Sequence, residues 1–195
     1  MAFWCYHLRK EVQDYRSALA ECHARERNQV ERVADDTPPA VPESLNPHFL
    51  FNSLNTIRYF VRTNADAARE LLLDLSLVLQ AALRTEAQVS LRDELETGRA
   101  YLRLEQARVG ERLEVRDLIP DEDLDKLVPS RCLLPLLQAL VKGVTERSAG
   151  GTVSLSLEQN SLVLESDATI HPPDSVPQGL TITTEPHPRI EWRLR

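Results

Sequence analysis

With 195 residues, the chain is long enough for one domain with a hydrophobic core or for two small ones. Its 23 basic and 30 acidic side chains give a net charge of −7, which argues against nucleic acid as a partner. The three cysteines are odd in number and widely spaced, so they predict neither a disulfide framework nor a metal site. A reducing cytoplasm is the expected compartment.

The N-terminal part of the chain divides at a proline-rich segment. Residues 1–34 are predicted to form a helix, because residues 7–33 lack glycine and proline and carry apolar side chains at roughly helical spacing. Residues 35–44 contain three prolines and are predicted to be a linker. The apolar opening, residues 1–6, is far shorter than the roughly 20 residues that span a membrane. It predicts either the start of a helix or the trailing edge of a membrane anchor, and the latter would give membrane contact at the N-terminus.

After the linker, the sequence predicts a helix that presents a histidine in its first turn. Asn46 suits the N-cap, and Pro47 suits the first helical position, where no backbone N–H is needed. His48 then lies where the helix dipole and the free N–H groups favour an anion such as a phosphoryl group. Asn52 follows one turn later on the same side, where it is expected to orient the imidazole ring or a water molecule. From these features alone, the alternative is an ordinary surface histidine at a helix start.

Residues 45–87 are predicted to form a helical hairpin. The first helix is expected from Asn46 to about Thr63, and the second from Ala67 to Arg84 with Asp66 as its N-cap. The apolar side chains of the second helix cover more than one helix face. We therefore expect two hairpins to dimerise into a four-helix bundle, with a core helix inside a single chain as the alternative.

Residues 88–195 are predicted to form a small α/β sandwich. Ser90 to Asp93 resembles a capping box, which opens a helix that ends near Arg108 with Gly110 as its stop. Another helix is expected to begin at Pro129 and to run from Arg131 to about Arg147. Strands are predicted over residues 113–119, 152–157, 162–165, 180–184 and 190–194, with Asn160 and Ser161 at a hairpin tip. The predicted fold class is thus α+β.

Residues 46–55, which read NPHFLFNSLN, resemble the phosphoacceptor block of the LytS/YehU-type sensor histidine kinases. The resemblance extends to about Val144. It implies a two-component signalling protein in which His48 takes a phosphoryl group from ATP and passes it to an aspartate of a response regulator. It also implies that residues 88–195 are a truncated form of the family's ATP-binding domain.

The same resemblance implies an ATP site, but the matching helix departs from the family pattern. PLLQALVKGV, residues 135–144, stands where the family has Pro-Leu-Val-Glu-Asn-Ala-Ile-Lys-His-Gly. Gln138 takes the place of the glutamate, Ala139 that of the metal-binding asparagine, and Lys142 that of the lysine. A methyl group cannot coordinate Mg²⁺, which prefers oxygen ligands.

The adenine-reading part of the site is also altered. Asp167 matches the family's adenine-binding aspartate, but Thr169 replaces the glycine two residues later, and no glycine-rich lid follows. We expect the ATP site to be degenerate, with no metal bound by the protein and with ATP and Mg²⁺ as cofactors only if residual binding persists.

Three hypotheses follow, ranked in this order. The first is a pseudokinase whose His48 is phosphorylated in trans by an intact partner kinase, or whose helical bundle is a docking scaffold. The second is an active sensor kinase that autophosphorylates on His48. The third is a purely structural dimerisation module. The expected partners are a second copy or an intact histidine kinase, and a response regulator.

Overall fold

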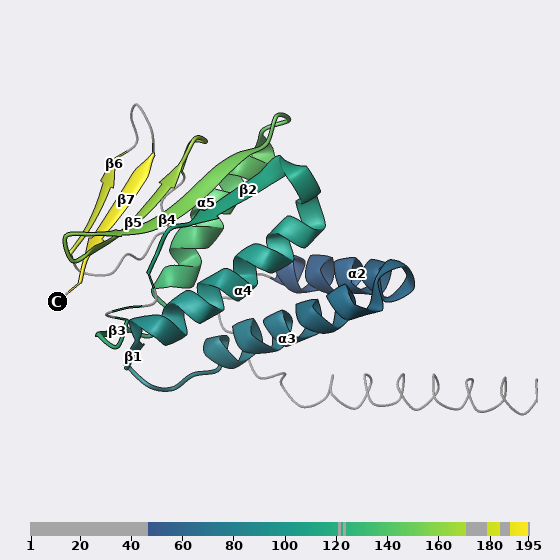
Figure 1. Ribbon diagram of the computed structural model, residues 1–195, viewed down its shortest axis with the longest axis horizontal. Helices are drawn as coiled ribbons and strands as arrows, with labels where there is room; N and C mark the ends of the chain where they lie inside the picture. Colours follow the sequence, from purple (N-terminus) through teal and green to yellow (C-terminus); the bar gives the residue numbers. More distant parts are fainter. Residues whose placement is uncertain (1–46, 121, 123, 171–178, 184–187, 195) are drawn as a thin grey trace, which may run out of the picture. The chain divides into compact units, whose positions relative to one another are not determined.

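The computed structural model describes residues 47–120, 122, 124–170, 179–183 and 188–194. The predicted N-terminal helix of residues 1–34, the linker of residues 35–44 and the cap residue Asn46 lie outside this range. The described residues form a mixed helix-and-sheet fold with a helical hairpin, which confirms the predicted fold class (Figure 1). None of the described helices combines the length and the apolar run that crossing a membrane requires.

The hairpin consists of α2 (Pro47–Thr63) and α3 (Ala65–Ala82), which pack against each other. Pro47 is the first residue of α2, as predicted. The prediction that Asp66 caps the second helix is wrong: the extended residue Asn64 is the cap, and its side-chain oxygen accepts a hydrogen bond of 3.1 Å from the N–H of Ala67. Both residue types cap helices well, so only the backbone conformation decides between them.

Helix α4 (Leu91–Val109) follows the short strand β1 (Gln88–Ser90) without a loop. The predicted cap is confirmed, because the hydroxyl oxygen of Ser90 accepts a hydrogen bond of 3.1 Å from the N–H of Asp93. Gly110, with φ of +64°, ends the helix as predicted and begins a 3₁₀ turn, Gly110–Arg112. A positive φ is readily accessible to glycine, which has no Cβ.

The main sheet has five strands in the order β2-β4-β5-β7-β6. Strand β2 runs parallel to β4, and the other neighbours are antiparallel. The strands are β2 (Leu113–Asp117), β4 (Gly151–Glu158), β5 (Ser161–Ser166), β6 (Leu180–Thr183) and β7 (Arg189–Arg193). The hairpin between β4 and β5 turns at Gln159 and Asn160, which both have positive φ, so its tip lies one residue earlier than predicted.

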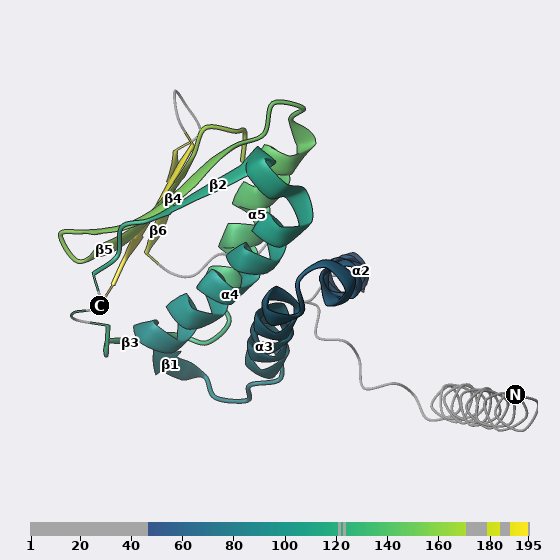
Figure 2. The same cartoon turned by 45° about the vertical axis from the view of Figure 1, so that its right-hand side comes forward.

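Helix α5 (Leu133–Glu146) and helix α4 lie on one side of this sheet, forming the second layer (Figure 2). The core between the layers is made of alternate strand residues and the inward side chains of α5: Val153, Leu155, Leu162, Leu164, Ile190, Leu133, Leu137 and Leu140. Helices α2 and α3 cover the other side of α4, and most of their buried apolar residues belong to the same core cluster.

A two-stranded ribbon was not predicted from the sequence. Strand β3 (Leu127–Pro129) pairs antiparallel with β1, and Val89 lies opposite Val128. The prediction that Pro129 begins a helix is therefore wrong. Pro129 ends a strand, and α5 begins at Leu133 after a turn.

Candidate functional site: a presented histidine and the expected nucleotide region

His48 lies exposed in the first turn of α2, and Asn52 lies beside it one turn later. The amide nitrogen of Asn52 is 3.2 Å from both ring nitrogens of His48. An amide N–H donates only to a ring nitrogen that carries a lone pair, so Asn52 donates to at most one of the two ring nitrogens at a time. The structure thus brings together the two side chains that the sequence pattern predicted to act together.

Helix α4 holds this histidine helix in place. Phe49 is buried, and its ring centroid is 5.2 Å from that of Tyr101 on α4, with a tilt of 45° between the rings. Burial raises the pKa of Tyr101, and the negative charge of Glu105 raises it further. Because Phe49 is anchored beneath the first turn, the neighbouring His48 is presented on the surface.

A groove runs along α2 next to this pair. Its volume is about 470 Å³, and Ala107 and Arg108 of α4 form one wall opposite Asn52, Asn55 and Tyr59 of α2. Helix α2 carries arginines but no acidic residue. The contribution of α4 was not predicted, because nothing local in the sequence shows that the end of α4 packs beside α2.

On α5, the residues at the expected phosphate-binding positions do not gather into a metal site. Gln138 is half-buried, and Lys142 is exposed, with its amino group 4.0 Å from Oε1 of Glu146. Ala139 is buried in the core. The position that resembles a metal-ligating asparagine thus holds an apolar side chain that faces the interior. Among the residues that the structure describes, no group of three or more histidine, cysteine or acidic side chains is placed to hold a metal.

Asp167 follows β5, where its carboxylate connects three elements. Its Oδ1 accepts a hydrogen bond of 2.9 Å from the N–H of Thr152 and lies 3.4 Å from the guanidinium of Arg147. Arg147 also donates to the backbone oxygen of Asp167 at 2.7 Å. A side chain on Gly151 would place its Cβ 2.2 Å from Oδ1, so this close approach requires glycine.

The chain that follows Asp167 packs directly onto α5. A Cβ on Gly143 would lie 2.0 Å from the carbonyl oxygen of Thr169, and both Ala168 and Ile170 are buried. The expected adenine-binding carboxylate is therefore engaged within the chain, and the segment beyond it rests on the helix that carries Gln138 and Lys142. At position 139, a methyl group offers no oxygen atom to Mg²⁺.

One important residue of this region was not predicted. Glu94 of α4 is buried, and its carboxylate accepts hydrogen bonds from the N–H groups of Arg131 (2.8 Å) and Leu133 (3.1 Å). A side chain of α4 thus caps the N-terminus of α5. The same carboxylate lies 3.7 Å from the sulfur of Cys132, and burial together with this negative charge raises the pKa of the thiol.

The described residues thus form a helical hairpin with a histidine in its first turn, joined to a two-layer α/β unit. The histidine kinase family model matches residues 40–113, which include His48 and α2 to α4. This segment belongs to the histidine kinase family.

The similar proteins indicate the type of histidine kinase. The sensor histidine kinase BtsS of Escherichia coli strain K12 is 34% identical over 157 residues, which are 77% of this chain and 27% of BtsS. The sensor histidine kinase YpdA of the same strain is 37% identical, over 62% of this chain and 22% of YpdA. The sensor histidine kinase/phosphatase LytS of Staphylococcus aureus strain Mu50 is 40% identical, over 58% of this chain and 20% of LytS. The chain is thus a relative of the LytS-type sensor histidine kinases, and it spans about a quarter of their length or less.

Among solved structures, the histidine kinase domain of a blue-light activated kinase from Erythrobacter litoralis EL346 matches 79% of this chain and 91% of that domain, at 17% identity and a TM-score of 0.32.

Proposed function

We propose that the protein acts in two-component signal transduction as a pseudokinase, whose His48 receives its phosphoryl group from an ATP-bearing partner kinase. The observation that carries this proposal is a contrast within one chain. His48 is presented beside Asn52, whereas Ala139 is buried and the segment around Thr169 packs on α5 where nucleotide would be expected. The sensor kinases among its relatives support the signalling role.

In the proposed reaction, a ring nitrogen of His48 attacks the γ-phosphorus of ATP held by the partner kinase. An N–P bond forms while the P–O bond to ADP breaks, and the ring proton passes to solvent. The Asn52 amide and the free N–H groups of the first turn of α2 are placed to stabilise the added negative charge. An aspartate of a response regulator then accepts the phosphoryl group.

The hairpin surface supports association with a second hairpin, either of this protein or of an intact kinase. Large apolar side chains are exposed on both helices: Phe51, Leu54, Val61, Leu72 and Leu73. A four-helix bundle would bury such side chains. The groove beside Asn55 and Arg108 suits an acidic response-regulator surface, because α2 carries no carboxylate. We propose a cytoplasmic location, with any membrane contact through residues 1–34.

Labelled ATP tests the trans-phosphorylation directly. The protein is incubated with Mg²⁺ and γ-labelled ATP, alone and with an intact LytS-type kinase of different size, so that the two chains separate on a gel. We expect label on this chain only in the mixture, and we expect His48→Gln to remove it. Robust labelling of the protein alone would contradict the proposal.

The second candidate, an active sensor kinase, is favoured by the relatives and by the retention of Lys142 on α5. Tight binding of Mg²⁺–ATP in calorimetry would support it. The third candidate, a structural dimerisation module, draws on the exposed apolar side chains of α2 and α3. It predicts that His48→Ala leaves signalling in cells unchanged.

A further inference from the structure

The groove along α2 carries positive charge close to His48. The part of it described above includes Asn52, the neighbour of His48. An adjoining part of about 350 Å³ shares Asn55 with it and adds Arg58 and Arg62. Among the described residues, no acidic side chain lines either part. The groove is thus basic on a chain whose net charge is −7.

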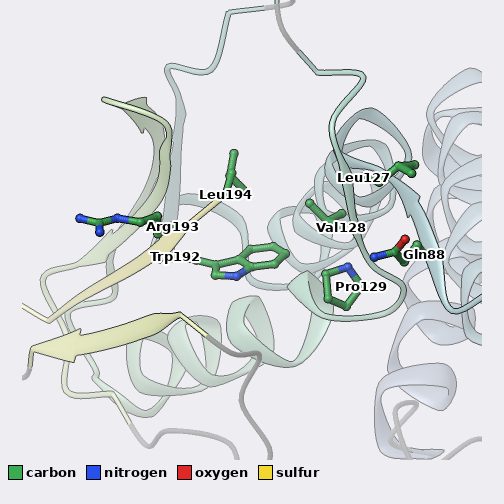
Figure 3. A pocket seen from close by; sticks show the side chains of 7 residues that line it. All are labelled: Gln88, Leu127, Val128, Pro129, Trp192, Arg193 and Leu194. Carbon is green, nitrogen blue, oxygen red and sulfur yellow. The ribbon is translucent and has the colours of Figure 1, made fainter.

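A second hollow, of about 280 Å³, lies between the ribbon of β1 and β3 and the end of β7 (Figure 3). Trp192 and Val128 on its walls are core side chains, only 4% and 2% exposed. The polar side chains of the groove along α2 differ from them, because Asn55, Arg58 and Arg62 are exposed. The groove is therefore the surface at which a charged partner can be bound.

Arg108 forms one wall of this groove and is held there by a buried carboxylate. Oε2 of Glu105, whose side chain is 7% exposed, accepts hydrogen bonds from Nε of Arg108 at 3.0 Å and from its Nη2. A guanidinium has five N–H donors in a rigid fork, so these bonds use two of them. No other described residue accepts a hydrogen bond from Arg108, and its side chain is 30% exposed. Glu105 thus fixes one edge of the guanidinium and leaves the other donors for an acceptor outside the chain.

The groove combines charges from two helices. Arg58 and Arg62 lie on α2, the helix that carries His48, whereas Arg108 lies near the end of α4. A surface that lies along the groove therefore contacts both helices. In the proposed reaction an aspartate takes the phosphoryl group from His48, so the partner brings negative charge to this part of α2. Contacts between arginine and carboxylate are strong and geometrically specific, because two N–H groups can bond two oxygens.

We propose that Arg108 is a specificity-determining residue that pairs with a carboxylate on the surface of the response regulator, and that Glu105 is the positioning residue that holds its guanidinium at the groove. In the transfer, the N–P bond to His48 breaks, an O–P bond forms at an aspartate oxygen, and the ring regains a proton from solvent. Arg108 binds the partner and takes no part in these bond changes. The inference rests on the proposed function only in that His48 passes its phosphoryl group to a response regulator.

Phosphotransfer from chemically loaded protein tests the inference. Phosphoramidate phosphorylates His48 without a partner kinase, since its P–N bond breaks and ammonia leaves. The loaded protein is mixed with increasing concentrations of the response regulator of the LytS-type kinase used above, and the transfer rate is measured on phosphate-affinity gels. We expect Arg108→Ala to raise the half-saturating regulator concentration about tenfold and to leave the maximal rate unchanged. Glu105→Gln should raise it about threefold, because the guanidinium is then held less firmly.

Further variants separate recognition from folding. Arg108→Lys should recover part of the affinity, because lysine keeps the charge but not the fork. Glu105→Gln combined with Arg108→Gln leaves no buried charge unpaired, so it replaces Arg108→Ala if that variant does not fold, and it should show the same tenfold rise. Arg69→Ala, at an exposed position of α3, is the control and should match the wild-type protein.

The two ways of failing are distinguishable. A half-saturating concentration that no Arg108 substitution changes would overturn the inference and leave the proposed function in place. A fall in the maximal rate alone would also overturn it, because that result would mean that the substitution displaces His48 and does not affect recognition. If the loaded wild-type protein transfers nothing, the proposed function is contradicted and the inference falls with it.

Discussion

A single buried carboxylate, that of Glu94, determines how α5 begins. The first N–H groups of a helix have no partner within the helix, and Cys132 at the N-cap position makes no side-chain cap bond. Glu94 provides the acceptor from another helix, and one of its two hydrogen bonds comes from Arg131, whose φ of +62° is unusual for a residue with a side chain. The hydrogen bond and the helix dipole offset that strain.

Glu94→Ala should therefore destabilise the protein by about 2–4 kcal/mol, because it leaves buried N–H groups unpaired. Glu94→Gln should cost less, since the amide keeps one acceptor oxygen. Urea unfolding measures both changes. Glu96→Ala, at an exposed position of the same helix, is the control and should change stability by less than about 0.5 kcal/mol. Equal losses for Glu94→Ala and the control would contradict a capping role.

Cys132 is predicted to be chemically protected. Burial and the nearby Glu94 raise the pKa of its thiol, and the thiolate is the form that reacts with alkylating reagents. At pH 8 we expect iodoacetamide to leave Cys132 unmodified in the native protein and to modify it after denaturation, as read by peptide mass spectrometry. Rapid alkylation of the native protein would contradict this.

The same shift predicts a pH dependence of stability. The folded-state pKa of Cys132 is higher than the unfolded value of 9.0. Below that pH the thiol is protonated in both states, so it adds no pH dependence to the free energy of unfolding. As the pH rises above about 9, the unfolded state loses a proton that the folded state keeps, and the free energy of unfolding falls. Cys132→Ala should make this fall shallower in urea unfolding at pH 8 to 10. Tyr101, whose pKa is also raised, would account for the remainder. An identical slope in wild type and variant would rule out Cys132 as its source.

At the scale of elements, the helices were predictable because their signals are local. The Ser90 cap and the Gly110 stop lie within one turn of the helix ends that they mark. The ribbon was not predictable, because strands of three residues show no periodicity and the partners of Val89 and Val128 are far apart in the chain. The site shows the same difference between local and distant signals. The contact of His48 with Asn52 was predictable, because it follows from a spacing of four residues.

The contacts in the expected nucleotide region join distant segments. Asp167 meets Thr152 and Arg147, and Gly143 meets Thr169, through the tertiary fold alone. The difference from the family pattern at Ala139 could be read from the sequence, because it is visible in the residue type itself. It could not find where the segment after Asp167 packs.

An ion pair joins the hairpin to the sandwich. Arg103 of α4 donates from Nε to Oδ2 of Asp74 at 2.9 Å and from Nη2 to Oδ1 at 2.5 Å, and the Asp74 side chain is only 8% exposed. Arg103→Ala leaves a buried carboxylate without its partner and should cost about 1–3 kcal/mol in urea unfolding. Arg103→Lys should recover part of the loss, because lysine keeps the charge but not the two-pronged geometry. Arg69→Ala, on the exposed surface of α3, is the control. An unchanged free energy of unfolding for Arg103→Ala would show that the ion pair does not stabilise the packing of α3 on α4.

At the scale of the whole molecule, the exposed apolar side chains of the hairpin predict self-association. Leu73 is 61% exposed on α3. Large exposed apolar patches usually mark interaction sites. Leu73→Glu should shift the molar mass from two chains toward one in light scattering at equal concentration, because a carboxylate in a packed interface is desolvated. Leu118→Glu is the matched control, since Leu118 is 68% exposed but lies after β2 and outside the hairpin. Equal masses for the two variants would exclude this face of α3 as the interface.

Ala139 on α5 stands where the sequence pattern predicts a ligand of Mg²⁺, so it tests whether this chain can both bind ATP and carry the phosphoacceptor His48. Restoring an amide by Ala139→Asn should not restore Mg²⁺–ATP binding in calorimetry, because Asp167 is engaged by Thr152 and the carbonyl of Thr169 still lies against Gly143. The variant should instead lose about 1–3 kcal/mol in urea unfolding, since it places an amide among core side chains. Lys142→Asn, at an exposed position of the same helix, should leave stability within about 0.5 kcal/mol of the wild-type value. Magnesium-dependent ATP binding by Ala139→Asn would mean that a single side chain separates this protein from an autonomous kinase, and His48 would then not need a donor on another chain.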